Sequence, residues 1–166
     1  MMRIFTSARD LRFSELMDVY SDSNLEKAEE WPNMPRGFAL QLAEQDFRQY
    51  LLEVFFKTPD AILAVWEHQG HYVSALRLEP YKDGLLLEGL ETAPEHRKCG
   101  YAADLILAVQ AYLAEQGVVK LYSHVEKRNV ASRRTHETCG FYEISDRAVY
   151  ISGSVDYRCC TYLYEA

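Results

Sequence analysis

The chain has 166 residues and a formal net charge of −7, and its hydrophobic and charged fractions are 48% and 26%. These values predict one globular domain over residues 1–166, and the acidic balance argues against a nucleic-acid partner because phosphates would be repelled. No apolar run approaches the ~20 residues of a membrane-spanning helix, and the first residues lack the apolar core of a signal peptide. We therefore expect a cytoplasmic protein with no membrane partner.

Acidic residues gather near the amino terminus of the chain. They either form a solvated helix face, which is the commoner role of such a cluster, or attract a cationic partner. The residues are Asp18, Asp22, Glu26, Glu29 and Glu30. Both interpretations stay open at the level of the sequence.

The four cysteines show no Cys-x-x-Cys spacing. They are Cys99, Cys139, Cys159 and Cys160. A reducing compartment favours free thiols over disulfides, and the spacings of the cysteines and histidines do not match a zinc site. We therefore expect neither a disulfide nor a bound metal.

In the first part of the chain, the pattern predicts a short strand over 4–7 and then a helix, for which Ser7 to Asp10 resemble a capping signal. A loop with two prolines follows over 31–37, and a strongly periodic helix comes after it. The apolar stripe of this second helix comprises Phe38, Leu42, Phe47, Tyr50, Leu51, Val54 and Phe55.

Three strands are expected next. Residues 61–67 and 72–78 flank a Gln69-Gly70 turn, which is typical of a β-hairpin. A second turn over 81–84 leads into a third strand over 85–92.

A helix from Ala102 to Leu113, ended by Gly117, follows the third strand and leads to a strand over 118–126. If the helix is a right-handed crossover, the strands before and after it are parallel. A parallel pair would then lie beside the antiparallel strands predicted earlier in the chain.

The last elements are a short helix over 131–138 and a hairpin of strands over 141–151 and 155–164, which turns at Ser152 to Ser154. The complete order is β-α-α-β-β-β-α-β-α-β-β. It predicts an α/β (α+β) fold with one mixed sheet, and ligands of such sheets tend to bind at strand carboxyl ends.

The segment from Arg97 to Ala102 joins the third strand to the following helix. A helix start exposes backbone N–H groups at the positive end of the helix dipole, and these groups suit an anion such as a pyrophosphate. Gly100 lets a ligand approach the backbone closely, while Arg97 and Lys98 add positive charge. The segment predicts a nucleotide-cofactor pocket, although the same spacing also occurs at ordinary helix starts.

A second motif lies downstream, Asn129-x-x-Ser132-x-x-x-His136-x-x-x-Gly140-Phe141. With Thr92-x-Pro94-x-x-Arg97-x-x-Gly100-x-Ala102 and the order of elements, the chain resembles the GNAT acetyltransferase superfamily. The resemblance covers nearly the whole chain and is strongest from Leu85 to Phe141. It implies a mixed, mostly antiparallel sheet with a central splayed pair of parallel strands and helices on both faces.

The resemblance also implies acetyl-CoA as cosubstrate. The loop that wraps the CoA pyrophosphate would comprise Arg97, Lys98, Cys99, Gly100, Tyr101 and Ala102. The backbone of Leu90, Glu91 and Thr92 would pair with the pantetheine amides and polarise the thioester carbonyl. Asn129 would hold the cofactor near the splay of the parallel strands, and Ser132 would lie at the next helix start.

His136 occupies a position where members of this family commonly carry a tyrosine near the CoA sulfur. A histidine there would still be a proton donor for the leaving thiolate, with a working pH range set by a reference pKa of about 6.5 instead of ~10. Alternatively, His136 packs or forms hydrogen bonds near the sulfur without transferring a proton. Tyr142, on the following strand, is a weaker substitute for the acid.

A general base is needed only if the acceptor amine arrives protonated. Glu88 is our first candidate, acting through a water if it does not reach the amine. By strand alternation Glu91 is expected on the opposite face, so at most one of the two faces the acceptor. His124 and Glu126 share a face of the next strand and are further candidates, although each is more often a solvated or hydrogen-bonded residue.

The activity that follows from the resemblance is direct transfer of an acetyl group to a primary amine of a small molecule or peptide. No covalent intermediate is needed, and Cys99 is rejected as a nucleophile because it lies in the phosphate loop. The acidic composition favours a cationic acceptor, and Tyr20, Trp31 or Phe38 are candidates to line its pocket, although such aromatics are more often core residues. Family members are often dimers, so a homodimer is an expectation without an identified interface.

Three alternatives remain for the function. The first is an acyl-CoA-binding regulatory or sensor domain that has lost catalysis, which the histidine at position 136 keeps open. The second is an acyltransferase that uses a longer acyl chain or an oxygen acceptor. The third, an unrelated metal-binding α/β protein, has the least support. Fold alone does not fix the acceptor.

Overall fold

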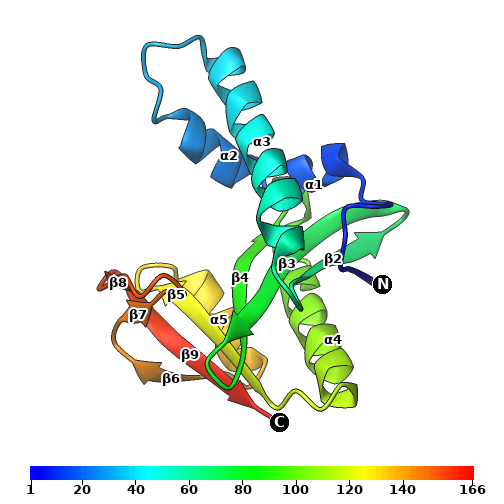
Figure 1. The fold of residues 1–166 in the computed structure, drawn as a ribbon, viewed down its shortest axis with the longest axis vertical. Helices are drawn as coiled ribbons and strands as arrows, with labels where there is room; N and C mark the ends of the chain where they lie inside the picture. The colour runs from blue at the N-terminus through cyan, green and yellow to red at the C-terminus, as the bar shows by residue number, and fades with distance from the viewer.

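The computed structural model describes all residues from 1 to 166 and contains one main sheet with helices on both faces (Figure 1). The strands are β1 (Met2–Phe5), β2 (Ile62–His68), β3 (His71–Tyr81), β4 (Gly84–Thr92), β5 (Lys120–Glu126), β6 (Tyr142–Ser145), β7 (Ala148–Val149), β8 (Val155–Asp156) and β9 (Cys159–Glu165). The α-helices are α1 (Phe13–Val19), α2 (Ser21–Ala28), α3 (Arg36–Glu53), α4 (Tyr101–Glu115) and α5 (Val130–Thr138). Two short 3-10 helices are η1 (Phe55–Lys57) and η2 (Pro94–His96).

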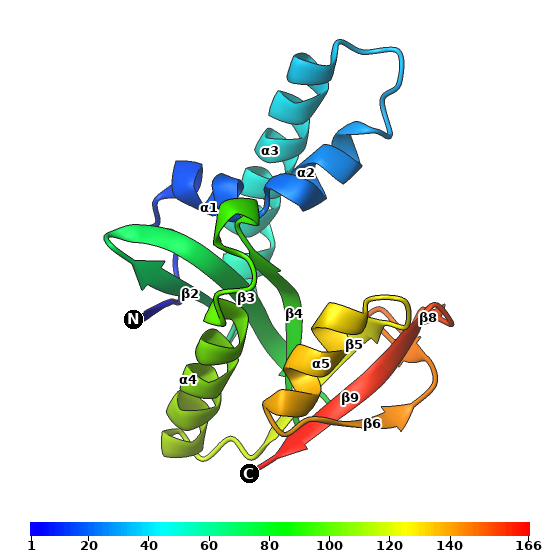
Figure 2. The same ribbon diagram turned by 180° about the vertical axis from the view of Figure 1, so that it is seen from behind.

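The main sheet has seven strands in the order β1-β2-β3-β4-β5-β9-β6. Every neighbouring pair is antiparallel except β4 and β5, which are parallel. Their ladder ends at Leu87 and Ser123, although both strands continue beyond it. Figure 2 shows β4 and β5 diverging from their paired segment. The predicted fold class, including the splayed parallel pair, is therefore confirmed.

Strand alternation separates two cores on opposite faces of the sheet. On one face, α4 covers Ala64 and Leu76, and the carboxyl end of α5 adds Phe141 next to it. On the other face, α1 and the end of α3 cover Leu63 and Ala75. Helices α2 and α3 then extend beyond the sheet as an arm, which is visible in both Figures 1 and 2.

Two parts of the predicted order are wrong in detail. The first predicted helix is two short helices, and Ser7 to Asp10 do not cap it, because the chain turns at Asp10 (φ 100°) and α1 begins only at Phe13. The last predicted hairpin is divided between two sheets: β6 pairs with β9 at the edge of the main sheet, and β7 pairs with β8 around the glycine turn. A register shift between Glu143 and Ser145 lets the chain leave the main sheet.

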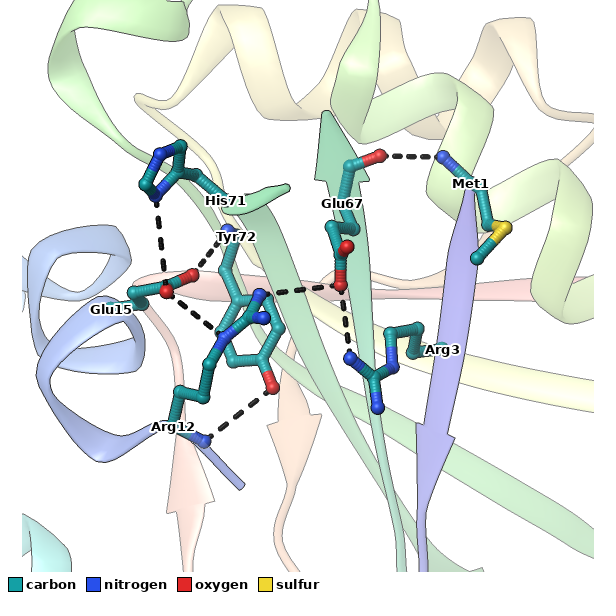
Figure 3. A network of polar contacts seen from close by, with 7 residues as sticks. All are labelled: Met1, Arg3, Arg12, Glu15, Glu67, His71 and Tyr72. Carbon is teal, nitrogen blue, oxygen red and sulfur yellow. Dashed lines mark hydrogen bonds and ion pairs between the residues drawn. The ribbon is translucent and has the colours of Figure 1, made fainter. Parts of the chain in front are cut away.

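A charged network attaches the amino-terminal strand and α1 to the sheet (Figure 3). Glu67 on β2 accepts hydrogen bonds from Arg3 at 3.1 Å and from Arg12 at 3.2 Å. Arg12 also pairs with Glu15 at 2.9 Å, and Glu15 accepts the backbone N–H of Tyr72 at 2.9 Å. Because one carboxylate serves two arginines from different segments, the network fixes where α1 lies against β3.

We expect Glu67→Gln to lower the melting temperature at neutral pH. The hydrogen bond from Arg3, with the charge of Arg12, holds the pKa of Glu67 below its usual range. A carboxyl with a lowered folded-state pKa contributes stability above its unfolded pKa and loses it as the pH falls. The difference between wild type and variant should therefore disappear in acid. Thermal unfolding from pH 3 to pH 8 tests this, with the exposed Glu115→Gln as control; equal melting temperatures at pH 7 would contradict it.

Candidate active site

The centre of the site is a β-bulge in β4 at Gly89, whose φ of 56° lies in the left-handed region. The register pairs Glu88 with Arg77 and Glu91 with Ala75. Arg77 and Ala75 are two residues apart on β3 and share a face, so their partners share it too. The expectation that Glu88 and Glu91 lie on opposite faces is therefore wrong, because the bulge inserts one residue between them.

A groove of about 500 Å³ runs between the end of β4, α2 and the start of α5; we call it the β4–α5 groove. Seven of the residues expected to bind the cofactor line it, namely Leu90, Glu91, Thr92, Arg97, Ala102, Asn129 and Ser132. The other lining residues are Asp22, Ser23, Glu26, Ala131 and Thr135. The two sequence motifs thus meet in space, on either side of the splay.

The loop before α4 has the backbone of an anion site. Lys98 and Gly100 both have positive φ, of 60° and 88°, and Gly100 is the N-cap of α4. A Cβ placed on Gly100 would meet no atom within 4 Å, so a ligand can reach the backbone there. Cys99 is exposed beside the loop. The ring centre of Tyr101 lies 5.2 Å from that of His68. The first-turn N–H groups of α4 have no intrahelical acceptor.

Arg97 is already paired with an anion in this structure. Its guanidinium donates to the Asp22 carboxylate of α2 at 2.6 Å and to the Thr92 carbonyl at 3.2 Å. The ion pair between Asp22 and Arg97 was not predicted, because an acidic cluster carries no signal for contact with a distant arginine. The Asp22 carboxylate thus makes with Arg97 the kind of charge-assisted hydrogen bond that a phosphate would make.

Asn129 and Ser132 form the start of α5. The Asn129 Oδ1 atom accepts the backbone N–H of Ser132 at 3.0 Å, which caps the helix. The Asn129 side chain thus fixes the direction of α5 and still borders the β4–α5 groove.

His136 is buried in the core, with 2% of its surface exposed, and does not line the groove. Its Nδ1 donates to the Ser132 carbonyl at 2.8 Å, so its Nε2 accepts from the Ser123 hydroxyl at 2.8 Å. Burial lowers the pKa of His136, which keeps the ring neutral at physiological pH. Of the two interpretations of this residue, the geometry favours the hydrogen-bonded core histidine.

A second cavity, of about 330 Å³, lies on the other side of the bulge; we call it the α2–α3 cavity. It is lined by Tyr20, Ser23, Asn24, Lys27, Ala43, Asp46, Phe47, Arg77, Gly89 and Glu91. Ser23 and Glu91 border both this cavity and the β4–α5 groove. The two spaces therefore meet at the Glu91 carboxyl, which accepts a hydrogen bond from Ser23.

Two carboxyl groups on this face titrate near neutrality. Burial, followed by the neighbouring Glu79 carboxyl, raises the pKa of Glu88 to about 7. Burial also raises the pKa of Glu91 to about 7, and its Oε2 atom is buried without a hydrogen-bond partner. Glu91 lines both spaces, whereas Glu88 lines neither. Carboxyls tuned to neutral pH are suited to proton transfer from an amine.

Of the remaining candidates, only Tyr20 borders either of these spaces. The ring of His124 is held edge-on between Tyr81 and Tyr150, and burial lowers its pKa. Of the three aromatic candidates for an acceptor pocket, Tyr20 lines the α2–α3 cavity and donates to the Gly89 carbonyl at 2.6 Å. Trp31 and Phe38 border a shallow depression on the arm instead.

No group of three or more histidine, cysteine, aspartate or glutamate side chains is arranged to hold a metal ion. No helix has both the length and the apolar content that a membrane crossing requires. The site thus consists of a groove beside a loop with the backbone of an anion site and a cavity that contains the neutral-range carboxyl of Glu91, joined at the end of a splayed parallel pair. This arrangement suits a phosphate-bearing ligand beside a small second ligand.

The chain belongs to the acetyltransferase (GNAT) family, whose profile matches residues 14–141. It is 41% identical over 64 residues to aminoglycoside N(6′)-acetyltransferase type 1 of Serratia marcescens, an alignment that covers 39% of this chain and 43% of that enzyme. The enzyme of the same name from Salmonella typhimurium (strain LT2) is 27% identical over 123 residues, covering 72% and 82% of the two chains. The family match therefore spans most of the chain, whereas the 41% identity is confined to 39% of it.

Solved structures share the fold at low sequence identity. The PaiA N-acetyltransferase of Thermoplasma acidophilum, solved in complex with coenzyme A, superposes with a TM-score of 0.67 at 12% identity and covers 100% of this chain and 99% of its own. Aminoglycoside 6′-acetyltransferase type Ii gives a TM-score of 0.66 at 14% identity, with 99% and 96% covered. These similarities confirm the acetyltransferase fold and leave the acceptor open.

We expect Asp22→Asn to tighten binding of acetyl-CoA, the cofactor expected from the sequence, because Arg97 would no longer be held by a carboxylate. An exposed ion pair contributes at most ~1 kcal/mol, so the gain in affinity should be about two- to fivefold. Calorimetric titration measures it, and Asp18→Asn, an exposed residue with the same change of charge, is the control. Unchanged or weaker binding by Asp22→Asn alone would show that the ion pair does not compete with the cofactor.

Proposed function

We propose that this acetyltransferase transfers the acetyl group of acetyl-CoA to a primary amine of a small molecule. The observation that carries the proposal is the meeting of the β4–α5 groove and the α2–α3 cavity at the bulge of β4. Cofactor and acceptor would reach the same backbone segment from opposite sides. Direct transfer, without an enzyme-bound acetyl group, requires such a meeting point.

The cofactor would bind along β4 and the loop that follows it. The N–H groups from Cys99 to Ala102 and the side chains of Arg97 and Lys98 would bind the pyrophosphate. Beyond Leu87, β4 has no strand partner on its β5 side, so its backbone is available to the amides of the pantetheine arm. Near Leu90, Glu91 and Thr92 a backbone N–H would polarise the thioester carbonyl.

The amine would reach the thioester through the α2–α3 cavity. Glu91 lies where the two spaces meet and would hold the ammonium group of the acceptor. Glu88, through a water, would take the proton before the nitrogen attacks the carbonyl carbon. The carbon–sulfur bond then breaks, and the thiolate leaves with the cofactor and takes up a proton from solvent. We assign His136 to positioning α5 against β5 through its bonds to Ser132 and Ser123.

The relatives that carry the aminoglycoside N(6′)-acetyltransferase name are named for amine acceptors. This agrees with an acceptor that enters the cavity in its ammonium form, as a cation. The acidic composition of the chain and the carboxyl groups at the junction favour the same charge. The homodimer, the cytoplasmic location and the single-domain organisation remain predictions.

We expect wild-type protein to bind acetyl-CoA and an Arg97→Ala/Gly100→Glu double variant to lose that binding. The variant removes a positive charge and places a carboxylate where the pyrophosphate would lie, next to the open backbone of Gly100. Calorimetric titration measures the loss, with the exposed Arg134→Ala as control. Absence of binding by wild type would contradict the acetyltransferase proposal. Binding without turnover of any amine would instead support an acyl-CoA sensor.

We expect kcat/KM for an accepted amine to rise with pH and level off above about 7, since Glu88 must be deprotonated to act as a base and its pKa is raised to about 7. Glu88→Gln should lower the plateau about 100-fold and leave only the pH dependence of Glu91, whose pKa is also raised to about 7 and whose ionised form holds the amine. Glu91→Gln should act mainly on KM. Initial rates of CoA thiol release between pH 5.5 and 9 test both variants; a wild-type plateau retained by Glu88→Gln would exclude it as the base.

A further inference from the structure

Arg77, on β3, is a guanidinium group without a protein partner. It belongs to none of the ion pairs and hydrogen bonds of the structure, and its Nε atom is buried with no acceptor. Its side chain is largely enclosed and lines the α2–α3 cavity. A partly buried cation whose N–H donors are unused is costly and requires an explanation.

Aromatic rings hold the guanidinium in place. Its central carbon lies 5.9 Å from the ring centre of Tyr20, 5.4 Å from that of Phe47 and 5.6 Å from that of Tyr50. These contacts fix the plane of the group and exclude water from its faces, but rings accept no conventional hydrogen bond from its N–H edge. The edge is therefore pre-organised for a ligand oxygen.

Neither acidic residue that lines the cavity, Asp46 or Glu91, forms an ion pair with Arg77. Lys27 is bonded to Glu30 at 2.5 Å and is thus committed elsewhere. The charges of Glu88 and Glu91 influence Arg77 only at longer range, since neither carboxylate forms an ion pair with it. Arg77 is accordingly the cation of this cavity that remains available to a bound molecule.

The position of Arg77 places that ligand oxygen close to the reacting amine. A Cβ added to Gly89 would lie 3.1 Å from the Arg77 Nη2 atom, so the guanidinium rests against the bulge of β4. The proposed attack takes place at the next residues of that strand. An oxyanion bound to Arg77 and an amine at Glu91 must then be only a few bonds apart.

We propose that Arg77 binds a carboxylate of the acceptor, and that the acceptor is a small amine bearing a carboxylate close to the nitrogen, as an amino acid does. This inference rests on the proposed function and specifies its substrate class. A guanidinium fork matches the two oxygens of a carboxylate. The cavity volume of about 330 Å³ lies at the small end of ligand sites and suits a molecule of this size better than a polycationic oligosaccharide.

The test compares the twenty common L-amino acids with their carboxamides, which differ only in the carboxylate, and includes kanamycin as an acceptor without one. The readout is kcat/KM from CoA release. In wild type we expect the best amino acid to exceed its carboxamide by at least about tenfold. In Arg77→Gln this ratio should fall to about 1. Arg48→Gln is the matched control, because Arg48 also stacks on a ring, that of Phe13, but lies outside the cavity.

Equal or faster turnover of the carboxamides or of kanamycin in wild type would overturn the inference, and so would a ratio that Arg77→Gln leaves unchanged. Each of these results would leave the acetyltransferase function intact. If no amine is turned over, a binding measurement tests the inference instead. Calorimetry with the CoA-loaded protein should show N-acetyl amino acids binding at least about tenfold more tightly than their amides, with the preference lost in Arg77→Gln. Absence of that preference would also overturn the inference.

Discussion

The separation of β4 from β5 beyond Leu87 is the constraint on which the rest of the site depends. Two parallel strands that stop pairing leave the backbone of β4 without a partner over its last residues, and an unpaired strand edge must find another partner or water. Helix α4 packs on β2 and β3, helix α5 packs on β5, and the two helices also contact each other. The fold therefore offers a backbone edge to an extended ligand, and the loop at Gly100 offers donors to its phosphates.

The bulge at Gly89 then gives this edge its chemistry. It turns Glu88 and Glu91 to the face that carries Arg77, where burial brings both carboxyls into the neutral range. One face thus combines carboxyls that exchange a proton near pH 7 with a cation held by aromatic rings. Helix α2 borders both spaces. Its Ser23 bonds to Glu91, and its Asp22 bonds to Arg97.

On the cofactor side, the expected residues come from two short motifs and from the family resemblance that they carry, and the structure brings seven of them together along one groove. The loop from Arg97 to Gly100 and the start of α5 at Asn129 depend on residues a few positions apart, which is why short motifs identify them. The acceptor side could not be predicted in the same way. Strand alternation predicts Glu88 and Glu91 on opposite faces, and the bulge brings them to the same face. A lone glycine within a strand is only a weak signal for a bulge. The bonds of Asp22 and the enclosure of Arg77 come from contacts between distant segments, which no local pattern encodes.

The central claim is that the bulge in β4 joins the two spaces, and Gly89→Ala tests it most directly. A Cβ there is strained at a φ of 56° and would meet the Arg77 guanidinium. The measurement is kcat/KM for an accepted amine together with the Kd for acetyl-CoA, against Gly153→Ala, which also has a positive φ (85°) but no atom within 4 Å of the added Cβ. The account predicts acetyl-CoA affinity within about threefold of wild type and a loss of kcat/KM of at least about tenfold, in Gly89→Ala only. Full turnover by Gly89→Ala would contradict it.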